Sequence, residues 1–223
     1  MIRRSLLAAG AAWFALVAAA PPAPVPATPP ADVYVAITTD RGVITLDLDR
    51  AHAPITVANF LRYVDIKRFD GTTFYRAMHL EWGTPPNGLI QGGIQNDPKR
   101  ALPPIAHEPT STTGVLHKAG AISMARFAPG TARGDFSILL SDLTSLDANP
   151  DAPDADGKAG FAAFGHVVEG MDTVRAIWDV PRSATKGEGV MKGQLFGVPV
   201  KIVSVRRVPA PAVVTPATGA PTP

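Results

Sequence analysis

The 223-residue chain contains no cysteine, which excludes disulfide bridges, thiol catalysis, thiolate zinc sites and lipid attachment at an N-terminal cysteine. It also lacks an excess of charge of one sign. The net charge of +2 comes from 21 Lys and Arg against 19 Asp and Glu, and Arg3 and Arg4 alone account for the difference. Because there is no basic run to release counterions, we expect no binding to nucleic acid.

The chain has no apolar run long enough to cross a bilayer. Residues 1–20 contain two arginines and then an uncharged stretch, residues 6–20, whose 15 residues are fewer than the roughly 20 of a membrane-spanning helix. This layout is typical of a secretory signal peptide. We therefore expect cleavage near Ala20, no stable membrane insertion afterwards, and a periplasmic or otherwise exported protein. The alternative interpretation is an uncleaved membrane anchor.

Proline is concentrated at the two ends of the chain. Eleven of the 23 prolines lie in residues 21–30 and 208–223, among Ala, Val and Thr. Neither stretch can form a packed core. The sequence therefore predicts a signal peptide (1–20), a stiff Pro/Ala-rich linker (21–31), one domain (32–208) and a disordered Pro/Ala/Thr tail (209–223). We expect this domain to be a monomer.

Hydrophobic spacing within the domain predicts mostly short strands. The predicted strands are residues 33–38, 43–48, 73–77, 89–91, 121–125, 136–140, 161–168 and 198–205. Two helices are predicted, one that begins at Pro54 and one over residues 171–178. No repeat of 20–50 residues is present. The pattern indicates a closed antiparallel barrel capped by two helices.

Five segments, in this order, resemble the cyclophilin-type peptidyl-prolyl isomerases. They are residues 53–60 (APITVANF), 73–76 (TFYR), 90–93 (IQGG), 120–126 (GAISMAR) and 164–171 (FGHVVEGM). The resemblance spans residues 33–207, and the MAR ending of the fourth segment is particularly similar to the bacterial branch. It implies an eight-stranded antiparallel barrel with a surface groove that rotates X–Pro bonds between cis and trans.

The resemblance implies a catalytic arginine and a groove glutamine. Arg76 matches the arginine, and Gln91 matches the glutamine, which is expected to hold the substrate carbonyl or to orient the arginine. Rotation has a barrier of roughly 18–20 kcal/mol because it breaks amide resonance. A donor aimed at the prolyl nitrogen lowers that barrier, since the lone pair becomes available only when the amide twists. No nucleophile, metal or cofactor is required.

The implied substrates are proline-containing polypeptides, in particular exported proteins during folding. The resemblance places a peptide along Met124, Ala125 and Arg126, where the backbone of Arg126 is expected to matter more than its side chain. The substrate-binding residues expected on this basis are Phe74, Trp82, Leu89, Met124, Ala125, Arg126, Phe136, Leu146 and Phe161.

The sequence departs from the family at the proline pocket. Ser137 stands where a phenylalanine is expected, Asp135 replaces a glutamine, and Ser145 replaces an aromatic residue. Trp82, in a long loop, either supplies a ring to the pocket or packs outside the barrel. One lost phenylalanine costs on the order of 1–3 kcal/mol of binding. We therefore expect weak substrate affinity, and the alternatives are an inactive proline-peptide-binding or chaperone module and a barrel kept for structure alone.

Other constellations carry less weight. The loop of residues 142–158 holds several aspartates, but it does not match the EF-hand template, and a solvated surface insertion is the favoured interpretation. The five histidines show no metal-ligand spacing, so we expect no metal site. A Ser-His-Asp hydrolase is disfavoured because no G-x-S-x-G motif is present.

Overall fold

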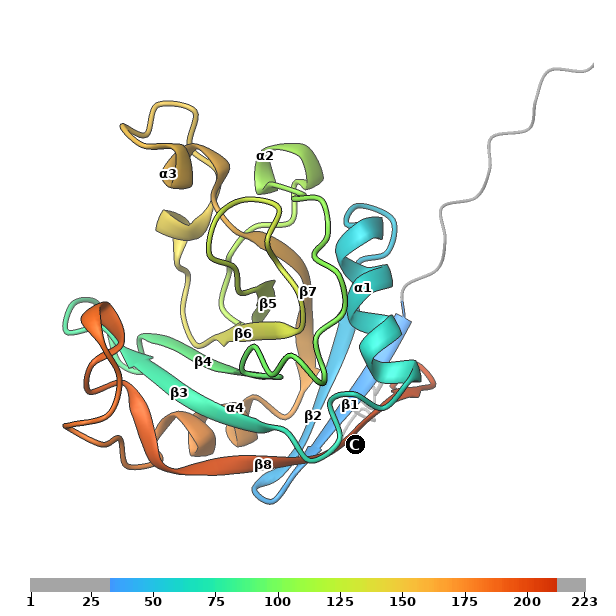
Figure 1. Ribbon diagram of the computed structural model, residues 1–223, viewed down its shortest axis with the longest axis vertical. Coiled ribbons are helices and arrows are strands. Elements are labelled where there is room, and N and C mark those ends of the chain that lie inside the picture. The colour runs from blue at the N-terminus through green and yellow to red at the C-terminus, as the bar shows by residue number, and fades with distance from the viewer. Residues whose placement is uncertain (1–32, 212–223) are drawn as a thin grey trace, which may run out of the picture.

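The computed structural model describes residues 33–211, which form a closed antiparallel barrel with strand order β1-β2-β7-β5-β6-β4-β3-β8 (Figure 1). The strands are β1 (Val33–Thr39), β2 (Gly42–Leu48), β3 (Thr73–His79), β4 (Gly88–Gly93), β5 (Ala121–Met124), β6 (Asp135–Leu139), β7 (Ala162–Glu169) and β8 (Leu195–Val208). This confirms the predicted mostly β, eight-stranded barrel. The predicted signal peptide, the linker and residues 212–223 of the predicted tail lie outside the described residues.

Two helices lie against the barrel from opposite sides, α1 (Pro54–Asp65) and α4 (Met171–Trp178) (Figure 1). Pro54 opens α1 because its fixed φ suits the first turn, where its missing N–H has no acceptor to find. The short helices α2 (Thr110–Thr113) and α3 (Ala155–Ala159) were not predicted, since one turn is too short to show a helical period. In residues 33–211 no helix has the length and hydropathy needed to cross a bilayer.

The core inside the barrel is built on aromatic rings. Phe136 of β6 contacts the rings of Phe60, Phe69 and Phe74 edge-on, with centroids 5.5, 5.5 and 5.8 Å away. Gly92 is required beside this cluster, because a Cβ there would lie 2.7 Å from the ring of Phe74. These rings are fully buried and fill the space between α1 and the strands.

A bulge in β3 determines which side chains face outward. In the β3–β4 register Phe74 lies opposite Gly92 and Arg76 lies opposite Gln91, so Tyr75 is the extra residue. Strict alternation would send Tyr75 and Arg76 to opposite faces. Instead Phe74 points into the core, while both Tyr75 and Arg76 line pockets on the outer surface.

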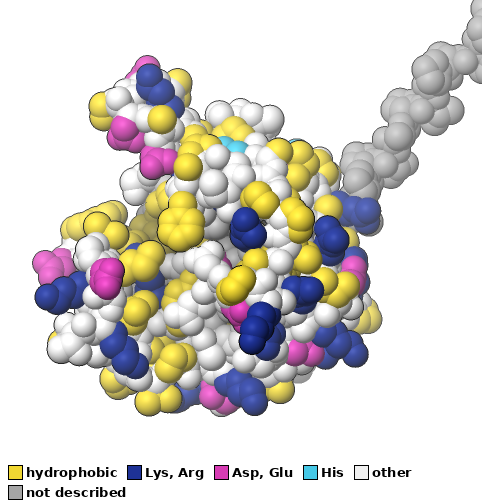
Figure 2. All heavy atoms as spheres, viewed as in Figure 1, with side chains coloured by type: hydrophobic (Ala, Val, Ile, Leu, Met, Phe, Trp, Pro, Cys, Tyr) yellow, Lys and Arg dark blue, Asp and Glu magenta, His cyan; other side chains and the backbone are white. Residues whose placement is uncertain are grey.

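Strand β8 is irregular at the same point. Phe74 pairs with Val200, but Arg76 pairs with Leu195, so residues 196–199 bulge out of the β3–β8 ladder. As a result β8 begins directly beside Arg76. Residues 183–194, which precede it, project next to the β3–β4 connection (Figure 1). Figure 2 shows a hollow between this projection and the loop that connects β6 to β7 and contains α3. Hydrophobic side chains lie on both sides of the hollow.

Candidate active site

Arg76 is held by two neutral side chains. Its Nε donates a hydrogen bond to Oε1 of Gln194 over 2.8 Å, and its Nη1 donates to Oε1 of Gln91 over 2.7 Å. Burial lowers the pKa of Arg76 from its ordinary value, yet a guanidinium stays protonated at neutral pH. No carboxylate among residues 33–211 forms an ion pair with Arg76. The site therefore presents a positioned positive charge that no acidic group neutralises.

A pocket of about 270 Å³ opens beside this arginine, and we name it the Arg76 pocket. It contains eight of the predicted site residues, on strands β3, β4 and β5 and in the connections that follow β5 and β6. Its lining residues are Arg76, Met78, Leu89, Gln91, Ser123, Met124, Ala125, Arg126, Ser137, Leu146, Phe161, Val190 and Met191. The walls are mostly apolar, and the guanidinium lies at one side.

Three predicted substrate-binding residues lie elsewhere. Phe74 and Phe136 are fully buried inside the barrel, because they occupy the inward positions of β3 and β6. Trp82 is 60% exposed and lines neither pocket described here, so it does not supply the missing pocket ring. The alternation of β6 corrects the predicted groove position of Phe136, and the bulge in β3 corrects that of Phe74. The outward course of the long loop corrects that of Trp82.

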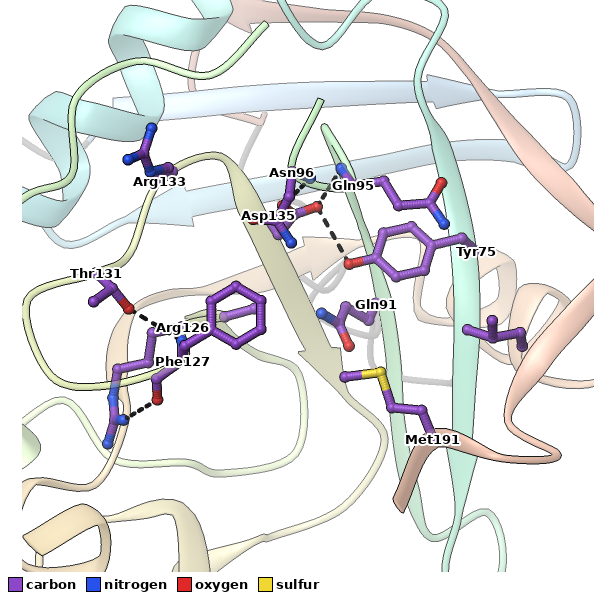
Figure 3. Close-up of a pocket in the computed structure, with 12 residues that line it drawn as sticks. Tyr75, Gln91, Gln95, Asn96, Arg126, Phe127, Thr131, Arg133, Asp135 and Met191 are labelled. Atoms are coloured by element: carbon purple, nitrogen blue, oxygen red, sulfur yellow. Dashed lines mark hydrogen bonds between the residues drawn. The ribbon is translucent and has the colours of Figure 1, made fainter. Parts of the chain in front are cut away.

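A second pocket of about 260 Å³ lies on the other side of a ridge formed by Gln91, Ala125, Arg126 and Met191, which line both pockets. We name it the Tyr75 pocket. Figure 3 shows Tyr75 pointing across it toward Asp135.

The carboxylate of Asp135 lies in the wall of the Tyr75 pocket. It accepts hydrogen bonds from the Tyr75 hydroxyl over 3.2 Å and from the backbone N–H groups of Gln95 and Asn96 over 2.7 and 3.1 Å. Burial raises the pKa of both Asp135 and Tyr75. The carboxylate is thus held by three donors on one side of the pocket.

The side chain of Arg126 is buried against the loop that connects β6 to β7 and contains α3. Its Nη1 donates to Oδ1 of Asp156 over 2.8 Å, and its guanidinium carbon lies 4.6 Å from the centroid of the Phe161 ring. Only 1% of the side chain is exposed. The Arg126 side chain therefore fixes the Phe161 ring in the pocket wall. The Arg126 guanidinium is consequently unavailable for the substrate.

A row of polar side chains crosses the floor of the Arg76 pocket from strand to strand. Arg76 pairs with Gln91, Gln91 with Ser137, and Ser137 with Ser123 in the β3–β4, β4–β6 and β6–β5 registers. Ser137 occupies the position where the sequence comparison with the family expected a phenylalanine. The floor is consequently polar where an apolar ring was expected.

The hydroxyl of Ser123 is hydrogen-bonded to a buried histidine. His117 Nε2 lies 2.8 Å from the Ser123 hydroxyl, and His117 Nδ1 lies 2.7 Å from Oδ1 of Asp147. His117 is fully buried, and burial lowers its pKa, so the ring is neutral. His117 and Ser123 are six positions apart and Asp147 lies 30 positions from His117, and the three follow no motif, so spacing alone could not find them. Ser123 lies in β5 beside a register shift against β7, and the chain of hydrogen bonds fixes its orientation.

The sequence analysis also missed Val190, Met191 and Gln194. All three belong to residues 183–194, a glycine-rich segment with one 3-10 turn (Gly189–Met191) and no hydrophobic period. Val190 and Met191 line the Arg76 pocket, and Gln194 bonds Arg76. Two adjacent apolar residues between glycines were the only available signal, and they indicate no particular contact.

Comparison with known proteins connects this geometry to a family. Residues 34–206 match the model of the cyclophilin type peptidyl-prolyl cis-trans isomerase/CLD family. The chain is 34% identical over 180 residues to a peptidyl-prolyl cis-trans isomerase of Acinetobacter baylyi, covering 79% of this chain and 86% of that protein. It is 34% identical over 157 residues to peptidyl-prolyl cis-trans isomerase cyp18 of Streptomyces antibioticus, covering 69% and 87%.

The fold is also similar to that of a solved structure. A cyclophilin type peptidyl-prolyl cis-trans isomerase of Cryptosporidium parvum superposes with a TM-score of 0.61 at 19% sequence identity, covering 81% of this chain and 100% of that one. A second crystal structure of the same protein, determined in the presence of the dipeptide Ala-Pro, gives a TM-score of 0.61 as well.

Proposed function

The chain belongs to the cyclophilin-type peptidyl-prolyl cis-trans isomerase family and is such an isomerase, and on that premise we propose that catalysis takes place in the Arg76 pocket. The observation that carries this proposal is the guanidinium held by Gln91 and Gln194 at the side of an apolar hollow. The proposed substrates are proline-containing segments of exported proteins during folding.

Arg76 lowers the barrier by binding the twisted amide. In the planar ground state the prolyl nitrogen donates its lone pair into the carbonyl, so it accepts no hydrogen bond. When the bond rotates, the lone pair localises on the nitrogen and can accept one. The Nη2 group of Arg76 is engaged by neither glutamine and is free to donate. This bond exists only in the transition state, and it therefore accelerates the reaction without strengthening ground-state binding.

The apolar part of the pocket holds the proline ring. Leu89, Met124, Leu146 and Phe161 supply this surface, and the peptide backbone runs along residues 124–126. The Cryptosporidium parvum relative was crystallised in the presence of Ala-Pro, which supports a proline peptide as the occupant. The mechanism draws on no metal or cofactor, because rotation transfers neither electrons nor groups.

The proposed location is the periplasm or another exported compartment. It rests on the two arginines and the short apolar run of residues 1–20, which lie outside the described residues. N-terminal sequencing of the protein from a bacterial host tests it. Cleavage near Ala20 and recovery in the periplasmic fraction are expected, and an intact leader in the cytoplasm would contradict the proposal.

Arg76→Ala tests the proposed site. We expect kcat/KM on a short Xaa-Pro peptide to fall about 100- to 1000-fold, as for other lost transition-state donors, with the urea unfolding midpoint unchanged. NMR exchange spectroscopy measures the rate directly. Arg175→Ala is the control, because within residues 33–211 Arg175 forms an ion pair only with the exposed Asp172 on α4. If Arg76→Ala and the wild type bind peptide equally and neither accelerates exchange, the pocket is a binding module.

A further inference from the structure

Residues 183–194 form a fixed arm beside Arg76. The arm is closed at its base by the backbone hydrogen bonds from Ser183 N–H to the Leu195 carbonyl over 2.7 Å and from Gly193 N–H to the Lys186 carbonyl over 3.0 Å. The carbonyl of Gln194 accepts a hydrogen bond from the N–H of Ala77 over 3.0 Å, which attaches the arm to β3 one residue beyond Arg76. The arm is therefore tied to the strand that carries the arginine.

The side-chain amide of Gln194 has only one orientation available to it. Its Nε2 donates to the carbonyl of Val190 over 2.8 Å, within the same arm. Its Oε1 must then face outward, and it accepts from Nε of Arg76 over 2.8 Å. A flipped amide would bring two donors together at Arg76 and two acceptors together at the Val190 carbonyl. The arm thus presents a fixed acceptor to one nitrogen of the guanidinium.

The acceptor is neutral, and this matters for the reaction. A carboxylate would hold the guanidinium more strongly, but it would also cancel much of the positive charge that the twisted amide needs. Gln91 holds Nη1 in the same neutral way. With Nε and Nη1 occupied, the planar fork has no rotation left, and Nη2 points to a single place.

We propose that Gln194 is a positioning residue for prolyl isomerisation, which fixes the Arg76 guanidinium through a neutral acceptor so that its charge and its remaining donors stay available to the substrate. This inference rests on the proposed function of the Arg76 pocket. It adds a residue from outside the two strands that carry Arg76 and Gln91, and it assigns the arm a part in the rate of the reaction.

Two substitutions separate holding the guanidinium from preserving its charge. Gln194→Met keeps the length of the side chain and removes the acceptor. Gln194→Glu keeps the acceptor and adds a negative charge, and like Gln194→Met it loses the donor to the Val190 carbonyl. Lys192→Gln is the matched control, because it changes the net charge by the same amount as Gln194→Glu, on the same arm, at an exposed residue that does not line the pocket.

Each variant is measured by peptide exchange kinetics and by the Arg76 Nε–H resonance in ¹⁵N-labelled protein. For Gln194→Met we expect loss of the exchange-protected Nε–H signal and a roughly tenfold lower kcat, with KM little changed, because a hydrogen bond to a charged group is lost. For Gln194→Glu we expect a protected Nε–H signal and a kcat that is also lower by roughly tenfold. Lys192→Gln is expected to match the wild type in both.

Several results would overturn the proposal. One is a wild-type kcat in both Gln194 variants. A second is a lower kcat in Gln194→Met while the Arg76 Nε–H resonance is unchanged. A third is a fall in the unfolding midpoint of Gln194→Met that accounts for its lower kcat. Both of these results show a purely structural role. These results differ from failure of the proposed site, in which Arg76→Ala itself retains wild-type activity.

Discussion

The residues on the two faces of strand β6 are under different packing constraints. Phe136 and Ile138 point into the barrel, are fully buried, and lie in the aromatic core. Asp135 and Ser137 alternate with them and line the two outer pockets. The inward residues must fill a fixed volume at crystal-like density, whereas the outward residues face a cavity that tolerates other side chains. Fold and site are therefore specified by alternate residues of one strand, and the site can depart from its family while the fold does not.

The comparison predicts the largest effect for an inward residue. Phe136→Ala removes a ring that contacts three others, and we expect it to lower the free energy of unfolding by about 3–5 kcal/mol. Ser137→Ala, one residue away on the outer face, is the control and is expected to change it by less than about 1 kcal/mol. Urea denaturation followed by circular dichroism measures both. Equal losses in the two variants would remove the distinction between the faces.

A smaller effect is expected when the outer face is returned to the family pattern. Ser137→Phe places an apolar ring on the pocket floor and increases the area in contact with a proline ring. We expect KM to fall so that kcat/KM rises roughly tenfold, within the 1–3 kcal/mol of one buried ring. Stability is expected to stay near that of the wild type. Ser137→Ala, which removes the hydroxyl without adding a ring, separates the two contributions, and a Phe variant with higher KM would contradict this interpretation.

The smallest expected effect concerns the hydrogen bonds behind the floor. Buried His117 is neutral in the folded protein because its pKa lies below the ordinary value of 6.5, whereas the unfolded chain binds a proton at that value. As the pH falls below about 6.5, the unfolded state binds more protons, and the free energy of unfolding decreases. His117→Gln is expected to lose this part of the pH dependence, and His166→Gln, at an exposed residue, to retain it. Urea unfolding at about pH 7.5 and 5.5 compares them, and identical slopes would contradict the assignment.

Much of the fold could be predicted because it rests on periodic burial. The predicted helix over residues 171–178 coincides with α4, and each predicted strand overlaps an observed one within a few residues. Arg76 and Gln91 were predicted as site residues through a family pattern, and the barrel brings both to one pocket. Alternation alone excludes Phe136 from the groove, because its neighbour Ser137 faces outward. Alternation would place Phe74 on the same face as Arg76, and only the bulge at Tyr75 separates the two.

The rest of the site could not be predicted because its contacts are not periodic. Gln194 hydrogen-bonds Arg76, which lies 118 positions earlier in the chain, and the arm that carries Gln194 contains glycines and one 3-10 turn. Asp147, in a loop with several acidic residues, finds its partner in a buried histidine 30 positions away. Such contacts depend on where loops end in space, and no pattern of polar and apolar residues along the chain encodes that.

The extra residue in β3 makes the two neighbouring pockets separately adjustable. Because Tyr75 is the additional outward side chain, its replacement changes the wall on one side of the ridge and leaves the guanidinium in register on the other. The lineage of this protein could thus alter what is accommodated beyond the ridge by single substitutions at one position. The reacting group would keep its place throughout, and selectivity could diversify at little cost to turnover.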